Sequence, residues 1–285
     1  MKNKLYITTP IYYVNAAPHI GHSYTTIAAD CLIRHARQRL GNDNVWFLTG
    51  TDEHGQKIQK AAESASVTAQ EFVDKVVVQF EDLWLKLGVS YSDFIRTTQK
   101  RHTTFVQRAL DIVYQKGDIY LDTYEGWYCT PCETFWPQSQ IVEQFCPDCQ
   151  RPVEKITEQN YFFRLSKYQS WLIDYIRSHP GFIRPQIREA EVLSFLTLHP
   201  LTDLCISRPK ERLNWGIPLP FSPEHVTYVW FDALINYISA VGSFNEQGVY
   251  SSPWWASDSE VVHLIGKDIL RQHAVYWPIM LQALG

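Results

Sequence analysis

The sequence predicts an α/β fold: an open, doubly wound parallel sheet that a long insertion splits into two halves. Strand-like and helix-like segments alternate from the N-terminus to about residue 117, as in a parallel sheet with helical crossovers. Polar loops with glycine follow two of these strands, and ligands bind at that edge of such sheets. We expect a first half of the sheet domain over 1–117, a connective insertion over 118–224 and a second half over 225–285.

Four strands are predicted from short runs of apolar, aromatic and β-branched residues, at 5–9, 45–48, 93–97 and 261–265. Apolar side chains at intervals of three and four predict helices at 23–40, 68–88, 103–116, 166–179, 189–198, 228–241 and 271–283. The helix at 68–88 has the clearest ends, because Thr68 and Glu71 form a capping box and Gly88 is a stop signal. Outside these helices, the insertion is expected to be irregular.

The bulk composition favours an intracellular protein with a large core. The chain has 285 residues, of which 45% are hydrophobic, and its net charge is −4. With 26 basic against 30 acidic residues, nucleic-acid binding would need a local patch or a further part of the protein. No apolar run reaches membrane-spanning length and the N-terminus lacks a signal peptide, so we expect a cytoplasmic location without membrane contact.

Two histidines lie at the first strand-to-helix junction, where residues 19–22 read His-Ile-Gly-His. Backbone N–H groups at a helix N-terminus attract anions, and phosphate is the usual one. Gly21 lets the backbone approach a ligand closely. The tetrapeptide alone would also fit surface histidines, so the phosphate interpretation depends on its position after a strand. A second polar loop, Thr-Gly-Thr-Asp-Glu-His-Gly at 49–55, follows the next strand.

Four of the six cysteines form two Cys-x-x-Cys pairs with thirteen residues between them: Cys129, Cys132, Cys146 and Cys149. Two such pairs are typical of a tetrahedral Zn²⁺ site with four thiolates. The alternative is disulfides, which are rare in a reducing compartment. A closed four-cysteine shell leaves no open position on the metal, so the expected zinc is structural. Cys31 and Cys205 lie in apolar patterns and are expected to pack.

The ordered set of motifs resembles the class I aminoacyl-tRNA synthetases and, among them, the bacterial type of the methionyl-tRNA synthetase family with one zinc knuckle. The resemblance covers essentially the whole chain and implies a Rossmann-like catalytic domain split by the knuckle insertion. The matching segments are 10–15 (Pro-Ile-Tyr-Tyr-Val-Asn), 19–22, 49–55, the cysteine pairs, 206–209 (Ile-Ser-Arg-Pro), 215–220 (Trp-Gly-Ile-Pro-Leu-Pro), 228–233 (Tyr-Val-Trp-Phe-Asp-Ala) and 263–268 (His-Leu-Ile-Gly-Lys-Asp).

The resemblance implies a two-step reaction. The carboxylate of methionine attacks the α-phosphate of ATP, bound with Mg²⁺, and the methionyl group then passes to tRNA(Met). Catalysis of this kind is positioning plus stabilisation of negative charge. The resemblance implies catalytic roles for His19, His22 and Lys267. It implies ATP contacts for His19, Gly21, His22, Gly266 and Asp268.

The family match also implies an amino-acid pocket, with a carboxylate for the α-ammonium group and an aromatic slot for the thioether. Asp52 matches the carboxylate. Trp230, Ala233 and Tyr237 have the spacing of one helical face, although such a stripe is often ordinary core. The implied methionine-binding residues are Ile11, Tyr13, Asp52, Trp230, Ala233, Tyr237, Ile269, His273 and Tyr276.

One departure from the family pattern is the absence of its Lys-Met-Ser-Lys-Ser signature. The chain stops at Gly285, where the family continues to a fifth strand, the lysine loop and an anticodon-binding domain. We therefore expect an N-terminal part with weak tRNA binding, weak adenylate formation and an unpaired fourth strand. The alternatives are an inactive methionine- or ATP-binding fragment, another class I synthetase or a nucleotidyltransferase. The pattern predicts no oligomeric state.

Overall fold

A computed structural model describes residues 2–130, 134–136, 141 and 143–285. Its central sheet has the strand order β13-β1-β2-β3, and all three pairings are parallel. The predicted doubly wound sheet is thus confirmed, with the fourth strand beside the first. Among the described residues, β13 has β1 as its one partner. The strands are β1 (Lys4–Tyr13), β2 (Val45–Asp52), β3 (Asp93–Arg96) and β13 (Ser259–His263).

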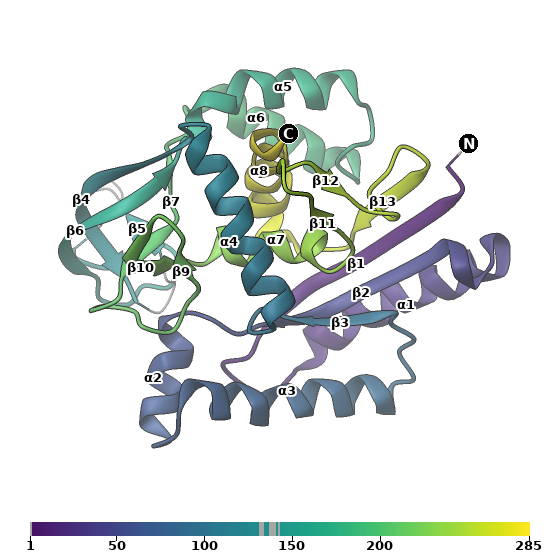
Figure 1. The fold of residues 1–285 in the computed structure, drawn as a ribbon, viewed down its shortest axis with the longest axis horizontal. Coiled ribbons are helices and arrows are strands. Elements are labelled where there is room, and N and C mark those ends of the chain that lie inside the picture. Colours follow the sequence, from purple (N-terminus) through teal and green to yellow (C-terminus); the bar gives the residue numbers. More distant parts are fainter. Residues whose placement is uncertain (1, 131–133, 137–140, 142) are drawn as a thin grey trace.

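Helices cover both faces of this sheet (Figure 1). On one face Ile7 and Phe47 pack in a core with α1, while Tyr12 packs with α3. On the other face Tyr6 and Leu48 share a core with α4, α7 and α8. The helices are α1 (Ile20–Leu40), α2 (Gln56–Ser64), α3 (Ala69–Lys86), α4 (Lys100–Gln115), α7 (Trp230–Ser239) and α8 (Trp277–Leu284).

The insertion holds a second, antiparallel sheet with the order β5-β4-β6-β7, so the prediction of an irregular segment was wrong. Alternate residues of β6 are buried, but Glu158 and Asn160 among them are polar, which hides the strand period in the sequence. The elements are β4 (Ile119–Cys129), β5 (Thr134–Trp136), β6 (Glu154–Phe163), η3 (Leu165–Tyr168), α5 (Gln169–Ser178), α6 (Gln186–Leu198) and β7 (Leu204–Cys205).

A small sheet of order β8-β10-β9 and a hairpin of β11 and β12 complete the fold. Strand β10 crosses the boundary predicted at residue 224, so the insertion is continuous with the second half of the sheet domain there. The strands are β8 (Ser207–Pro209), β9 (Pro218–Leu219), β10 (Ser222–Thr227), β11 (Ser243–Phe244) and β12 (Tyr250–Ser251).

Several helix ends differ from the predicted ones. Helix α7 begins at Trp230 rather than 228, because Val229 has a φ of 51° that no α-helix accepts. The last predicted helix opens with a 3-10 turn, η4 (Lys267–Ile269), and a π-helical turn, η5 (Gln272–Tyr276), before α8. Helix α2 was not predicted. The capping box of Thr68 and Glu71 at α3 is confirmed.

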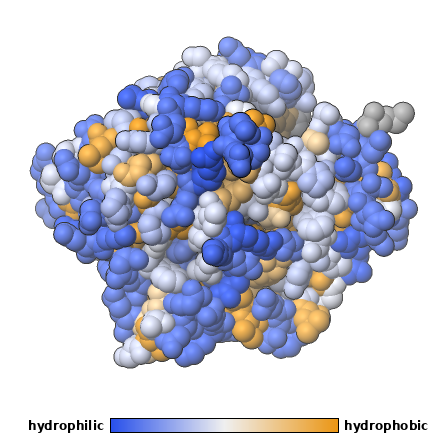
Figure 2. Space-filling view, viewed as in Figure 1, coloured by the Kyte–Doolittle hydropathy of each residue, from blue (hydrophilic) through white to orange (hydrophobic). Residues whose placement is uncertain are grey.

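The core runs from the sheet into the insertion. Leu172 of α5 and Leu196 of α6 belong to the same buried cluster as Tyr6 of β1. The face in Figure 2 is mostly hydrophilic, with apolar groups in small separate patches. None of the helices in the described part of the chain combines the length and apolarity that a membrane span requires.

Candidate functional site

The candidate site lies at the carboxyl end of β1, which has a parallel partner on each side. The register with β2 shifts between Thr8 and Ile11. This bulge turns Ile11 into the same cluster as Tyr6, on the face that α7 and α8 cover. Beyond the bulge, Tyr13 lies opposite Asp52. Two residues implied for methionine binding are therefore neighbours on adjacent strands.

The two histidines of the 19–22 motif close the N-terminus of α1. Nδ1 of His19 accepts a hydrogen bond of 3.1 Å from the backbone N–H of Gly21. Nδ1 of His22 accepts one of 3.1 Å from the N–H of His19, and the two rings stack 3.8 Å apart. Burial, together with His19, lowers the pKa of His22 to about 4. Both Nδ1 atoms accept hydrogen bonds, so the ring proton of each histidine lies on Nε2. These Nε2–H groups can donate hydrogen bonds to an anion.

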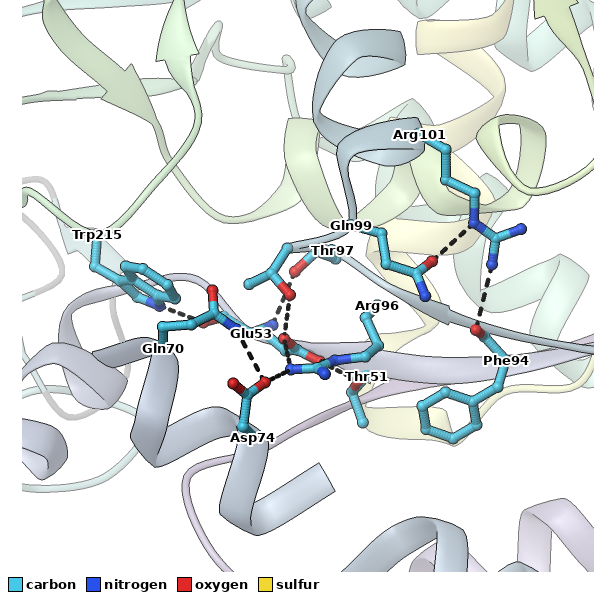
Figure 3. Close-up of polar contacts among 11 residues, drawn as sticks. Thr51, Glu53, Gln70, Asp74, Phe94, Arg96, Thr97, Gln99, Arg101 and Trp215 are labelled. Carbon is cyan, nitrogen blue, oxygen red and sulfur yellow. Dashed lines mark hydrogen bonds and ion pairs between the residues drawn. The ribbon is translucent and has the colours of Figure 1, made fainter. Parts of the chain in front are cut away.

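The loop after β2 is held by Glu53, whose side chain is fully buried. Arg96 donates to both of its carboxylate oxygens, with Nε to Oε1 at 2.7 Å and Nη2 to Oε2 at 2.9 Å (Figure 3). The backbone N–H of Glu53 donates to the hydroxyl of Thr97 at 2.9 Å, and its carbonyl accepts from the indole of Trp215. Because Asp52 immediately precedes Glu53, this network fixes the backbone that carries Asp52.

One wall of the site joins α7 to the segment after β13. The hydroxyl of Tyr237 lies 2.7 Å from Nε2 of His273, whose Nδ1 lies 2.9 Å from the carbonyl of Ile269. A carbonyl can only accept, so the ring proton is on Nδ1 and Tyr237 donates to Nε2. Two residues implied for methionine binding, far apart in sequence, are thus joined directly.

The same wall contains His263, the last residue of β13. The indole N–H of Trp277 donates to Nε2 of His263 at 3.1 Å. Nδ1 of His263 therefore carries the proton and donates to the hydroxyl of Thr8 at 2.7 Å. Tyr237 packs on this pair, with ring centroids 4.3 Å from His263 and 5.6 Å from Trp277.

Both histidines of this wall are neutral at pH 7. Burial, assisted by His273, lowers the pKa of His263 to about 3. Burial also lowers the pKa of His273 to about 4. The wall is therefore aromatic and uncharged, which suits an apolar or thioether group.

A cleft of about 1330 Å³ separates the segment after β13 from α6 and residues 199–205 of the insertion. The implied residues Trp230, Lys267, Asp268 and Tyr276 line it. The residues that line it do not include the other implied ones: Ile11, Tyr13, His19, Gly21, His22, Asp52, Ala233, Tyr237, Gly266, Ile269 and His273.

Sequence reasoning assigned no role to Trp277, His263 or Arg208, although the last two lie in segments that match the family. The π-helical turn before α8 changes the phase of the helix, so that Tyr276 lines the cleft while the ring of Trp277, the next residue, lies 5.6 Å from that of Tyr237. Arg208 is 2% exposed, and its guanidinium lies 4.3 Å from the ring of Tyr128. A charged residue between the apolar positions of Ile-Ser-Arg-Pro was the available signal for it.

Three of the predicted metal ligands meet at the tip of the insertion. The sulfur atoms of Cys129, Cys146 and Cys149 lie within 4.8 Å of one another, and the first two residues are buried. Zn–S bonds of about 2.3 Å in a tetrahedron place sulfurs about 3.8 Å apart, which this spacing fits. The Cys129 and Cys149 sulfurs are 3.5 Å apart, too far for a disulfide. Cys132 lies outside the described residues.

Comparison with protein families gives a match over almost the whole chain. The model of the tRNA synthetases class I (M) matches residues 5–157 and 150–285. The methionine–tRNA ligase of Clostridium acetobutylicum is 51% identical over 283 residues, and that of Bacillus subtilis is 45% identical over 293. The matches cover 99% of this chain, which spans about 43% of the length of these curated relatives.

Solved structures agree with the sequence comparison. The methionyl-tRNA synthetase of Mycobacterium tuberculosis bound by methionyl-adenylate has a TM-score of 0.89 and 40% sequence identity. The match covers 99% of this chain and 55% of that one. The free form of the same enzyme has a TM-score of 0.78 at 37% identity.

Proposed function

Because the chain belongs to the family of the class I tRNA synthetases (M), we propose that it binds methionine and ATP and forms methionyl-adenylate as the catalytic part of a methionine–tRNA ligase. The observation that carries the proposal is the neutral aromatic wall of Tyr237, His263, His273 and Trp277. An uncharged, polarizable surface of this kind favours contacts with sulfur. A nucleotidyltransferase would account for the histidine motif but not for this wall.

Methionine would bind with its two ends on different elements. The carboxylate of Asp52, placed by the Glu53 network, would accept the α-ammonium group, and Tyr13 lies opposite Asp52 in register. The thioether would lie toward Tyr237 and His273. The whole proposed set is Ile11, Tyr13, Asp52, Trp230, Ala233, Tyr237, Ile269, His273 and Tyr276, to which the geometry adds Trp277.

ATP would bind as its Mg²⁺ complex beside the histidine motif. The Nε2–H groups of His19 and His22 would donate to phosphate oxygens, and Gly21 would lie against the adenine. Lys267, which lines the cleft, would add positive charge as pyrophosphate leaves. Gly266 and Asp268 would hold the ribose side. No protein nucleophile is needed, because the carboxylate of methionine attacks the α-phosphate.

Zinc would be structural and bound by Cys129, Cys132, Cys146 and Cys149. The three clustered sulfurs support this, and with Cys132 as the fourth ligand the shell would be closed and leave the metal no catalytic position. The three-part division at residues 117 and 224 and a cytoplasmic location belong to the same proposal. So does transfer of the methionyl group to tRNA(Met).

A calorimetric titration of the 285-residue chain with methionine tests the proposal, with valine and cysteine as controls. We expect methionine to bind selectively and Asp52→Ala to lose that binding, because the ammonium group would lose its counter-charge. Equal binding of the three amino acids, or full binding by Asp52→Ala, would refute the assignment of the pocket.

A further inference from the structure

A buried carboxylate links the loop after β2 to α7 beside the proposed methionine site. Asp232 is in the first turn of α7, between Trp230 and Ala233, and it is 2% exposed. Its Oδ2 lies 2.7 Å from Nδ1 of His54, and its Oδ1 lies 2.8 Å from Nε2 of His102. None of these three side chains has a role in the site described above.

The partners of Asp232 come from two other elements. His54 belongs to the loop after β2 and is two residues beyond Asp52. His102 belongs to the first turns of α4, and its Nδ1 lies 2.8 Å from the hydroxyl of Ser239 at the far end of α7. The carboxylate therefore joins the loop that would hold the ammonium group to the helix that would hold the thioether.

The hydrogen bonds of His54 and His102 are made to an ionised carboxylate, that of Asp232. Burial opposes its ionisation, but His54 and His102 outweigh that effect and hold the pKa of Asp232 at about 2. Hydrogen bonds to an ionised acceptor are shorter and stronger than neutral ones. Hydrogen bonds of this strength resist a change in the distance between the Asp52 loop and α7.

The distance between the Asp52 loop and α7 matters for specificity, because methionine would have to span it. A pocket that adjusts its length accepts amino acids one methylene shorter or longer, and hydrophobic contacts alone discriminate such pairs poorly. A fixed separation would penalise the longer side chain by overpacking.

We propose that His54 and Asp232 are positioning residues that set the distance between the Asp52 loop and α7 and so select methionine by its length. The inference rests on the proposed function, because it concerns the same pocket. A network that served folding alone would affect all ligands of the site equally, whereas this one acts on side-chain length.

Two substitutions at His54 separate its hydrogen bond from its bulk. His54→Asn places an amide N–H near the position of Nδ1 and keeps the bond to Asp232, whereas His54→Ala removes it. We expect His54→Ala to weaken methionine binding by about 10- to 100-fold, the range for a lost charged hydrogen bond. His54→Asn should stay within about threefold of the original affinity. The ATP affinity should change in neither variant.

The selectivity readout uses ethionine, which is longer than methionine by one methylene. We expect the preference for methionine over ethionine, measured by calorimetry, to fall in His54→Ala and to persist in His54→Asn. If His54→Ala does not fold, His54→Gln replaces it, because its longer side chain carries the amide past Nδ1 while keeping a similar bulk. Thermal unfolding of each variant reports whether it has folded.

The inference would be overturned if His54→Ala and His54→Asn bound methionine equally well, or if His54→Ala lost affinity equally for methionine and ethionine. Either result would leave the proposed function intact. If the unmodified chain bound ATP but no methionine, the proposed function and this inference would both fail.

Discussion

The hydroxyl of Tyr237 donates a hydrogen bond of 2.7 Å to Nε2 of His273, a residue 36 positions further along the chain. The bond joins α7 to the segment after β13, and the carbonyl of Ile269 fixes the ring tautomer from the other side. A proton on Nε2 would reverse the bond, because the ring would then donate and the hydroxyl of Tyr237 would accept. A doubly protonated ring would also place a positive charge in the wall of the proposed thioether site, which burial opposes.

Acid should destabilise the fold through His273. The pKa of an unfolded histidine is about 6.5, and burial lowers that of His273 to about 4. Between these values the unfolded chain takes up a proton that the folded chain excludes, so stability falls as pH drops from 6.5 to 4. We expect the melting temperature to decline over this window, and less steeply in His273→Gln. Identical slopes for both proteins would contradict this explanation.

Glu53→Gln should cost about 3 kcal/mol of unfolding free energy, because it leaves Arg96 with a broken buried ion pair. Asp74→Asn is the matched control. Asp74 binds the same arginine but its side chain is 49% exposed, and its loss should cost less than about 1 kcal/mol. Urea denaturation of the two variants measures the difference. Comparable losses would show that the buried pair does not anchor the loop.

Gly50→Ala should be destabilising by about 2 kcal/mol or more. A Cβ atom at Gly50 would lie 2.0 Å from the backbone carbonyl of Ile95 in the next strand. Gly88→Ala, where a Cβ meets nothing within 4 Å but φ is 65°, should cost about 1 kcal/mol by strain alone. Thermal unfolding of the two variants measures these losses of stability. A smaller loss in Gly50→Ala than in Gly88→Ala would refute the close approach of β2 and β3 at Gly50.

The cysteine cluster should bind about one zinc ion per chain. Cys146→Ser should lose most of that metal, because Cys146 contributes one of the clustered sulfurs. Cys31→Ser should keep it, since Cys31 lies outside the cluster and is exposed, so the prediction that it packs was wrong. Atomic absorption on desalted protein measures the content, and retention of zinc by Cys146→Ser would argue against the site.

Patterns that repeat regularly were predictable from sequence. The alternation of strand-like and helix-like segments predicted the four strands of the central sheet and the order of its two halves along the chain. Thr68 and Glu71 predicted the N-terminal cap of α3. The antiparallel sheet of the insertion was not predictable in this way, because buried polar residues such as Glu158 and Asn160 interrupt its apolar period.

The residues of the site also divide into those that the sequence predicted and those that it could not predict. Motifs located the loops around His19 and Asp52, which the fold brings to the carboxyl ends of β1 and β2. Spacing could not identify Trp277, because a π-helical turn changes the phase of the helix just before it. It could not identify Asp232 either, since its histidine partners are more than 100 positions away in sequence.

Methionine and ATP are proposed to bind side by side at the carboxyl end of β1. A non-reactive methionyl-adenylate analogue, with a sulfamate in place of the phosphate, tests both halves of the site in one calorimetric titration of the 285-residue chain. We predict that it binds more tightly than methionine, and that Asp52→Ala and His22→Ala each weaken it. Absence of binding by the folded chain, or binding that neither substitution changes, would contradict the claim.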